Sequence, residues 1–101
     1  MNKDFLIDYY RMTGDRWSAL KGVKNILVNP GLRYLFYSRN ADNNRFYKFI
    51  SLPLQRKYGL EFRTKNIGKG LYIGHPRSIV INKQATIGNN CNINQGVTIG
   101  R

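Results

Sequence analysis

The sequence predicts an α+β fold, with a helical region over residues 1–59 followed by a coil of short strands over residues 60–101. The composition changes near Gly59, because the Phe and Trp residues, apart from Phe62, precede it and Ile, Gly and Asn dominate after it. Apolar residues recur at helical spacing before this change, and isoleucine recurs at intervals of six after it. A chain of 101 residues has room for one small domain built from these two regions.

Four helices are expected in the first region. The first covers residues 3–13 and ends at Gly14. The second has Asp15 as its N-cap and continues with apolar residues at helical spacing. The third begins at Pro30, with Asn29 as its cap, because proline is favoured at the first helical position.

The fourth helix is expected to begin after Asn43 or Asn44 and to end at Gly59. Pro53 should kink or interrupt it, because proline removes a backbone hydrogen-bond donor. The apolar residues expected to form the core here and in the preceding helices are Trp17, Phe36, Phe46, Phe49 and Ile50.

Isoleucine repeats almost regularly in the second region. It occurs at positions 67, 73, 81, 87, 93 and 99, with intervals of 6, 8, 6, 6 and 6. Six residues do not complete a whole number of helical turns, and one long strand would need long exposed pairing. Short strands separated by sharp turns fit the period, with each hexad as one wall of a coil and its isoleucine inside. The nearby asparagines, Asn89, Asn90, Asn92 and Asn94, suit tight turns with left-handed backbone.

The stretch Ile67–His75, together with Ile79–Ile81, resembles the hexapeptide-repeat acyltransferases, and is most similar to serine acetyltransferases and their relatives in bacterial surface-polysaccharide loci. The resemblance covers residues 60–101 and extends loosely to Asn29–Arg33. It implies a left-handed parallel β-helix after the helical region and a homotrimer. It also implies acetyl-CoA as co-substrate and transfer of its acetyl group to a hydroxyl acceptor, either L-serine, as in cysteine biosynthesis, or a sugar. The CoA-binding residues are not identified.

By this resemblance, His75 matches the catalytic histidine of the family. A neutral imidazole can take the proton of a hydroxyl as that hydroxyl attacks a thioester. Glu61 falls near the position of the aspartate that orients the histidine in the family. The alternatives are a solvent-facing loop histidine for His75 and a charge at the start of a strand for Glu61.

The sequence departs from the family in two places. Gly74 stands where serine-specific members carry an aspartate that holds the substrate amine, which leaves room for a sugar acceptor. A second catalytic histidine and the CoA-binding strands of the family would follow Arg101. The chain is therefore expected to be truncated at its C-terminus, and an inactive fragment or a non-catalytic subunit is the alternative to an active enzyme.

The charge has two interpretations. Lys and Arg number 17 against 5 Asp and Glu, so the formal net charge is +12. This charge would attract the phosphates of CoA, and it would also attract nucleic acid. Basic residues interleaved with tyrosines could stack on bases, but the charge is not concentrated on one expected helix, which argues against a nucleic-acid-binding module.

The remaining composition limits the other classes of protein. The single cysteine, Cys91, rules out an internal disulfide framework and a cysteine zinc site, and is expected to be a small buried thiol. No metal site is expected. No apolar run approaches the ~18 residues of a membrane span, and the first eight residues lack the apolar stretch of a signal peptide. We expect a cytoplasmic location.

Overall fold

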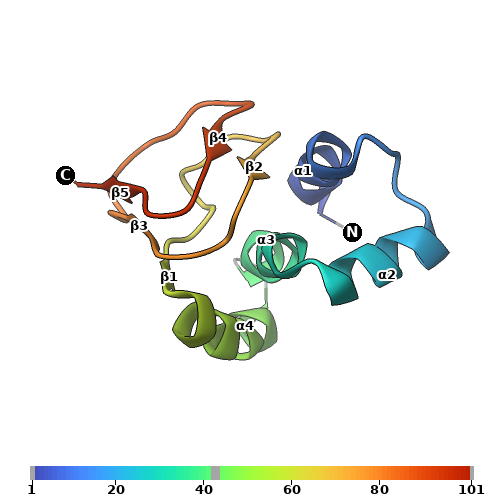
Figure 1. Ribbon diagram of the computed structural model, residues 1–101, viewed down its shortest axis with the longest axis horizontal. Coiled ribbons are helices and arrows are strands. Elements are labelled where there is room, and N and C mark those ends of the chain that lie inside the picture. The colour runs from blue at the N-terminus through green and yellow to red at the C-terminus, as the bar shows by residue number, and fades with distance from the viewer. Residues whose placement is uncertain (1, 42–43, 101) are drawn as a thin grey trace.

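The computed structural model describes residues 2–41 and 44–100, which form helices and very short strands (Figure 1). The elements are α1 (Lys3–Thr13), α2 (Ala19–Val28), α3 (Pro30–Ala41), α4 (Arg45–Tyr58), β1 (Leu60–Glu61), β2 (Tyr72–Ile73), β3 (Ile79–Ile81), β4 (Asn92–Ile93) and β5 (Thr98–Ile99). In Figure 1 the strands gather on the left, with α3 between them and α2 and with α4 below β1. The helical region thus packs against one side of the strand region.

Three of the predicted helices begin or end as expected. Gly14 ends α1 with a left-handed φ of 78°, and Gly59 ends α4 with a φ of 65°. The Asn29 side chain accepts hydrogen bonds from two N–H groups in the first turn of α3, at 2.9 and 3.2 Å. The side chain of Asn44 caps α4 in the same way, at 2.9 Å. The other candidate cap, Asn43, lies outside the described residues.

The predicted start of the second helix is wrong. Asp15 does not cap it, because α2 begins at Ala19 after Ser18. The aromatic ring of Trp17 explains the later start, since it packs edge-on against Phe5 and Tyr9 of α1, with ring centroids 6.1 and 5.2 Å apart. The connecting segment is therefore held against α1 rather than wound into α2.

Helix α4 also differs from its prediction. It continues through Pro53 without interruption. Phe46 and Phe49, expected in the core, are 61% and 72% exposed, whereas α4 buries Ser51 and Leu54. Side chains three residues apart lie on the same face of a helix. The face of α4 that packs on the rest of the protein therefore contains Ser51 and Leu54, and Phe46 and Phe49 lie on another face.

The strands pair in parallel in two small sheets. The first sheet has the order β1-β3-β5, with Leu60 beside Ile79 and Val80 beside Thr98. The second joins β2 to β4, and a separate bridge joins Ile67 to Ile87.

The predicted coils of a left-handed parallel β-helix are wrong. Each described strand has only two or three residues, and these strands are too few and too short to build β-helix coils. Left-handed backbone at Gly70, Ser78, Asn90 and Gly96, with φ of 80°, 54°, 58° and 75°, bends the chain between these short strands. The structure is instead a mixed α+β fold in which helices pack on small sheets.

The buried positions of the isoleucine repeat were predicted correctly, although the architecture was not. Ile67, Ile73, Ile81 and Ile93 are at most 6% exposed, and Ile87 and Ile99 are half-buried against the same core. The core continues into the helices through Phe5 and Tyr9 of α1 and Leu32, Tyr34 and Leu35 of α3. One apolar interior therefore joins both regions.

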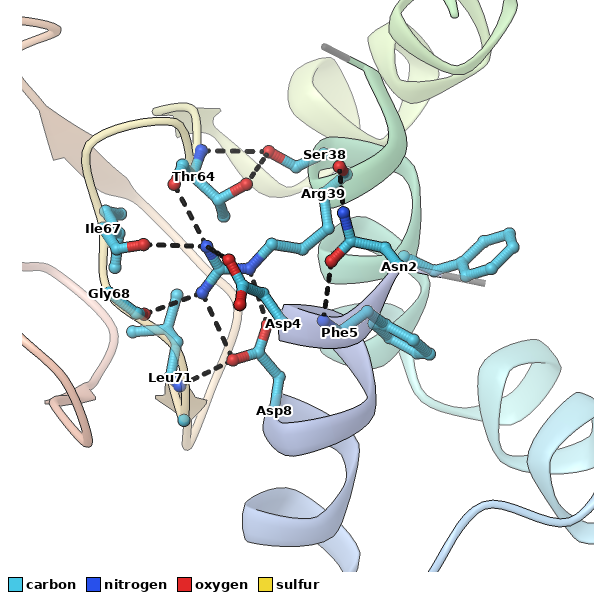
Figure 2. Close-up of polar contacts among 12 residues, drawn as sticks. Asn2, Asp4, Phe5, Asp8, Ser38, Arg39, Thr64, Ile67, Gly68 and Leu71 are labelled. Atoms are coloured by element: carbon cyan, nitrogen blue, oxygen red, sulfur yellow. Dashed lines mark hydrogen bonds and ion pairs between the residues drawn. The ribbon is translucent and has the colours of Figure 1, made fainter. Parts of the chain in front are cut away.

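A buried ion pair connects α1 to α3 within this interior (Figure 2). Arg39 donates to both carboxylate oxygens of Asp8, at 2.7 and 3.2 Å, and both side chains are buried. Burial raises the pKa of Asp8, while the hydrogen bond and the charge of Arg39 oppose this rise.

The same arginine holds the loop between β1 and β2. Its remaining N–H groups donate to the carbonyls of Thr64, Ile67 and Gly68 at 3.1, 2.7 and 2.8 Å. Asp8 in turn accepts from the backbone N–H of Leu71 at 2.8 Å. We call this set, Asp8 and Arg39 with the backbone of residues 64–71, the Arg39 junction. All five N–H donors of the guanidinium are used, which offsets the cost of burying its charge.

Replacing Arg39 should test how much the fold depends on this junction. Arg39→Ala leaves the Asp8 carboxylate and three loop carbonyls without their donor, so we expect a loss of about 3–5 kcal/mol of unfolding free energy. Urea denaturation followed by circular dichroism measures it. The control Arg45→Ala, at an exposed position, should change stability by less than about 0.5 kcal/mol. Equal losses in both variants would contradict the assignment.

Two glycines in neighbouring turns provide a second test. A Cβ atom on Gly68 would lie 2.8 Å from backbone atoms of Gly88 and Asn89, whereas one on Gly88 would meet nothing within 4 Å. Gly68→Ala should therefore cost about 1–3 kcal/mol through overpacking, and Gly88→Ala should cost less than that. Thermal unfolding of the two variants measures the difference, and a tolerated Gly68→Ala would show that the two turns are not in contact.

Candidate functional site

His75 lies in the turn that joins β2 to β3, and its side chain is exposed. Among the described residues, no hydrogen bond engages either nitrogen of its imidazole. Both ring nitrogens are thus free to contact a bound molecule from solvent.

The turn itself is held firmly at both ends. Before His75, the N–H of Gly74 donates to the carbonyl of Ile93 at 3.0 Å. After it, the N–H of Ser78 donates to the carbonyl of Tyr58 at 2.7 Å, and the carbonyl of Arg77 accepts from Gly96 at 3.0 Å. These bonds fix the backbone on either side of an exposed imidazole.

The residue before the histidine is covered by an amide. A Cβ atom on Gly74 would lie 2.3 Å from the Oδ1 atom of Asn94, so the Asn94 side chain occupies the space that a side chain at position 74 would fill. The proximity of Asn94 to Gly74 could not be predicted from the sequence, because only the pairing of β2 with β4 brings the two positions together. The side chain that lies over Gly74 is therefore a neutral amide.

Glu61 lies elsewhere. It is exposed at the end of β1 and lines a groove between α4 and the strands, whereas His75 is not among the residues that line this groove. In the described part of the chain, no hydrogen bond or ion pair joins the two side chains. A single chain thus does not bring the predicted base and its predicted orienting carboxylate together, and both roles stay predictions.

The groove that contains Glu61 is large and basic. Its volume is about 1120 Å³. It is lined by five cationic side chains, Lys48, Arg56, Arg63, Lys65 and Lys83. Among the lining residues that the structure describes, Glu61 is the only carboxylate. The excess of positive charge is visible in the sequence. Its concentration in this groove is not, because the five residues come from three separate segments.

Tyr34 supports the floor of the groove. Its hydroxyl donates to the carbonyl of Phe62 and accepts from the Nε2 atom of Gln55 at 3.1 Å. Burial raises the pKa of Tyr34, and the nearby charge of Arg63 partly opposes this rise. The phenol therefore acts as a neutral link between α3, α4 and the segment that follows β1.

Other candidate features carry no site. Cys91 is a free, half-buried thiol packed against the core, consistent with the structural role expected for it. In residues 2–41 and 44–100, no three His, Cys, Asp or Glu side chains gather in a way that could hold a metal ion. Within the same residues, no helix has the length and apolar character needed to cross a bilayer.

Comparison of the chain with protein-family models, with curated proteins and with solved structures finds no match in any of the three. The function of the chain is therefore inferred from its own residues and their geometry.

Proposed function

We propose that the protein transfers an acetyl group from acetyl-CoA to a hydroxyl acceptor, with His75 as the general base. The observation that carries the proposal is the exposed imidazole of the only histidine, on a turn whose backbone is fixed on both sides. The sequence around it, Gly70–His75, supports the same reaction through its resemblance to hexapeptide-repeat acyltransferases.

The chemistry requires one proton carrier. A neutral nitrogen of the His75 imidazole removes the hydroxyl proton as the acceptor oxygen attacks the thioester carbon. The new C–O bond forms, the C–S bond breaks, and the imidazolium returns its proton to the departing CoA thiolate. The products are an acetyl ester and free CoA, and the imidazole is restored.

The acceptor is better described as a sugar hydroxyl than as L-serine. Gly74 provides no carboxylate for a substrate amine, and the group beside it is the neutral amide of Asn94. An amide can donate to and accept from the hydroxyl groups of a neutral acceptor. A cytoplasmic reaction and a homotrimer belong to the same proposal, the first because acetyl-CoA is available there and the second by the resemblance alone.

Substitution of His75 tests the proposal directly. We expect His75→Ala to lower kcat/KM for CoA release from acetyl-CoA by about 10²–10⁴-fold, the usual contribution of a general base. Because the side chain is exposed, the variant should keep its unfolding free energy within about 0.5 kcal/mol. The measurement is thiol release with sugar and L-serine acceptors compared in parallel. Full activity of His75→Ala, or no acetyl transfer by the unsubstituted chain, would contradict the proposal.

Two further variants complete the assay. Lys3→Ala, at an exposed position on α1, is the control and should keep the activity. Glu61→Gln tests the orienting role predicted for Glu61. If that carboxylate orients the imidazole, its loss lowers kcat while leaving the unfolding free energy unchanged. An unchanged kcat would remove Glu61 from the mechanism.

A further inference from the structure

The groove between α4 and the first sheet gathers positive charge from separate segments. Helix α4 contributes Lys48 and Arg56, the segment after β1 contributes Arg63 and Lys65, and the segment after β3 contributes Lys83. With five cations and one carboxylate among the lining residues, the formal charge of the lining is 5 − 1 = +4.

The alternation of burial after β1 exposes part of this charge. Phe62 and Thr64 are buried, while Glu61, Arg63 and Lys65 are exposed. Arg63 follows Phe62 just after β1, and Lys65 lies in a turn in which the N–H of Ile67 donates to the carbonyl of Thr64 at 3.0 Å. The carbonyl of Thr64 is held from inside by Arg39 at 3.1 Å, so the segment that faces the groove has a fixed support.

In the described part of the chain, none of these five cations takes part in an ion pair. In residues 2–41 and 44–100, both ion pairs involve Arg39, which lies 2.7 Å from Asp8 and 4.0 Å from Asp4. The five groove cations therefore repel one another, and among the described lining residues the single carboxylate of Glu61 offsets only part of their charge. An anionic ligand would relieve that repulsion, and a low-dielectric wall would strengthen its binding.

The groove is not lined by charge alone. Leu52, which is 37% exposed, and the half-buried Ala85 supply apolar surface, and the amide side chains of Gln55 and Gln84 also line the groove. Its volume of about 1120 Å³ is that of a site for an organic molecule rather than for a single small anion. Apolar walls with a few polar groups and several cations suit a ligand with an organic body and a phosphate-rich end.

We infer that this groove is a binding site for a ligand that carries a diphosphate on an organic body, of the nucleoside diphosphate type. The inference does not rest on the proposed function, because it uses only the charge, size and lining of the groove. Two sources share this chemistry: CoA, whose nucleotide half contains a diphosphate, and an acceptor sugar linked to a nucleoside diphosphate. The His75 turn precedes strand β3, and Ile81 at the end of that strand is among the residues that line the groove.

Binding to the full chain tests the inference, with ADP, CoA and inorganic pyrophosphate as probes in calorimetry at physiological salt. We expect ADP to bind, and pyrophosphate to bind more weakly because it lacks the organic body. The double variant Arg63→Gln/Lys65→Gln should lose at least tenfold in ADP affinity, because two charge-assisted contacts to the diphosphate are removed.

The matched control removes the same charge elsewhere. Lys21→Gln/Lys24→Gln, at exposed positions on α2 outside the groove, should change ADP affinity by less than about threefold. Equal losses in the two double variants, or no binding of any probe, would overturn the inference. Tight binding of a single-stranded oligonucleotide with no binding of ADP would also overturn it.

A second measurement avoids reliance on the folding of a variant. Bound ADP should protect Lys65 and Lys83 of the unsubstituted chain from acylation by an amine reagent, and should not protect Lys21 or Lys24. Peptide mass spectrometry reads each site. Uniform protection, or none, would contradict a groove site.

The measurement with CoA distinguishes the proposed groove site from the proposed acetyl transfer. Competition between CoA and ADP would identify the groove as the site for the nucleotide half of the co-substrate. Binding of ADP with no binding of CoA would keep the groove site and contradict the use of acetyl-CoA.

Discussion

The buried pairing of Arg39 with Asp8 is the constraint on which the rest of the structure depends. It joins α1 to α3 and reaches the loop carbonyls of Thr64, Ile67 and Gly68, so one guanidinium fixes the helical region to the strand region. A buried charge is tolerated only when its hydrogen-bonding capacity is met, and here every donor is used. The segment after β1 therefore has a fixed path, and with it the exposed cations that face the groove.

A second arginine, Arg11, connects α1 to the strand region at the surface. Arg11 of α1 donates to the carbonyl of Gly70 at 3.0 Å and to the side chain of Asn92 at 2.6 Å, which links α1 to the turns flanking β2 and β4. The His75 turn follows β2, and its neighbour Asn94 follows β4. The base proposed for acetyl transfer is thus placed by short parallel strands that are too brief to be stable alone and that the helices hold together.

Local signals in the sequence predicted what they physically control. The caps at Asn29 and Asn44 and the left-handed stops at Gly14 and Gly59 depend on a few neighbouring residues, and the structure contains them. The isoleucine period likewise identified which side chains are buried. It did not determine the architecture. The same isoleucines are buried here by strands of two or three residues that pack against helices. The exposure of Phe49 on α4 also depends on which face meets α3, and helical spacing alone does not specify that.

Local patterns in the sequence are enough to place the helix ends, the buried isoleucines and the irregular turn that contains His75, because each depends on neighbouring residues. Only the tertiary structure decided that Asp8 meets Arg39, that Asn94 covers Gly74, and that cations from α4 and from the segments after β1 and β3 share one groove. These contacts join residues that are 20 and 31 positions apart or lie between separate elements. Their formation depends on how the elements pack, which no local pattern encodes.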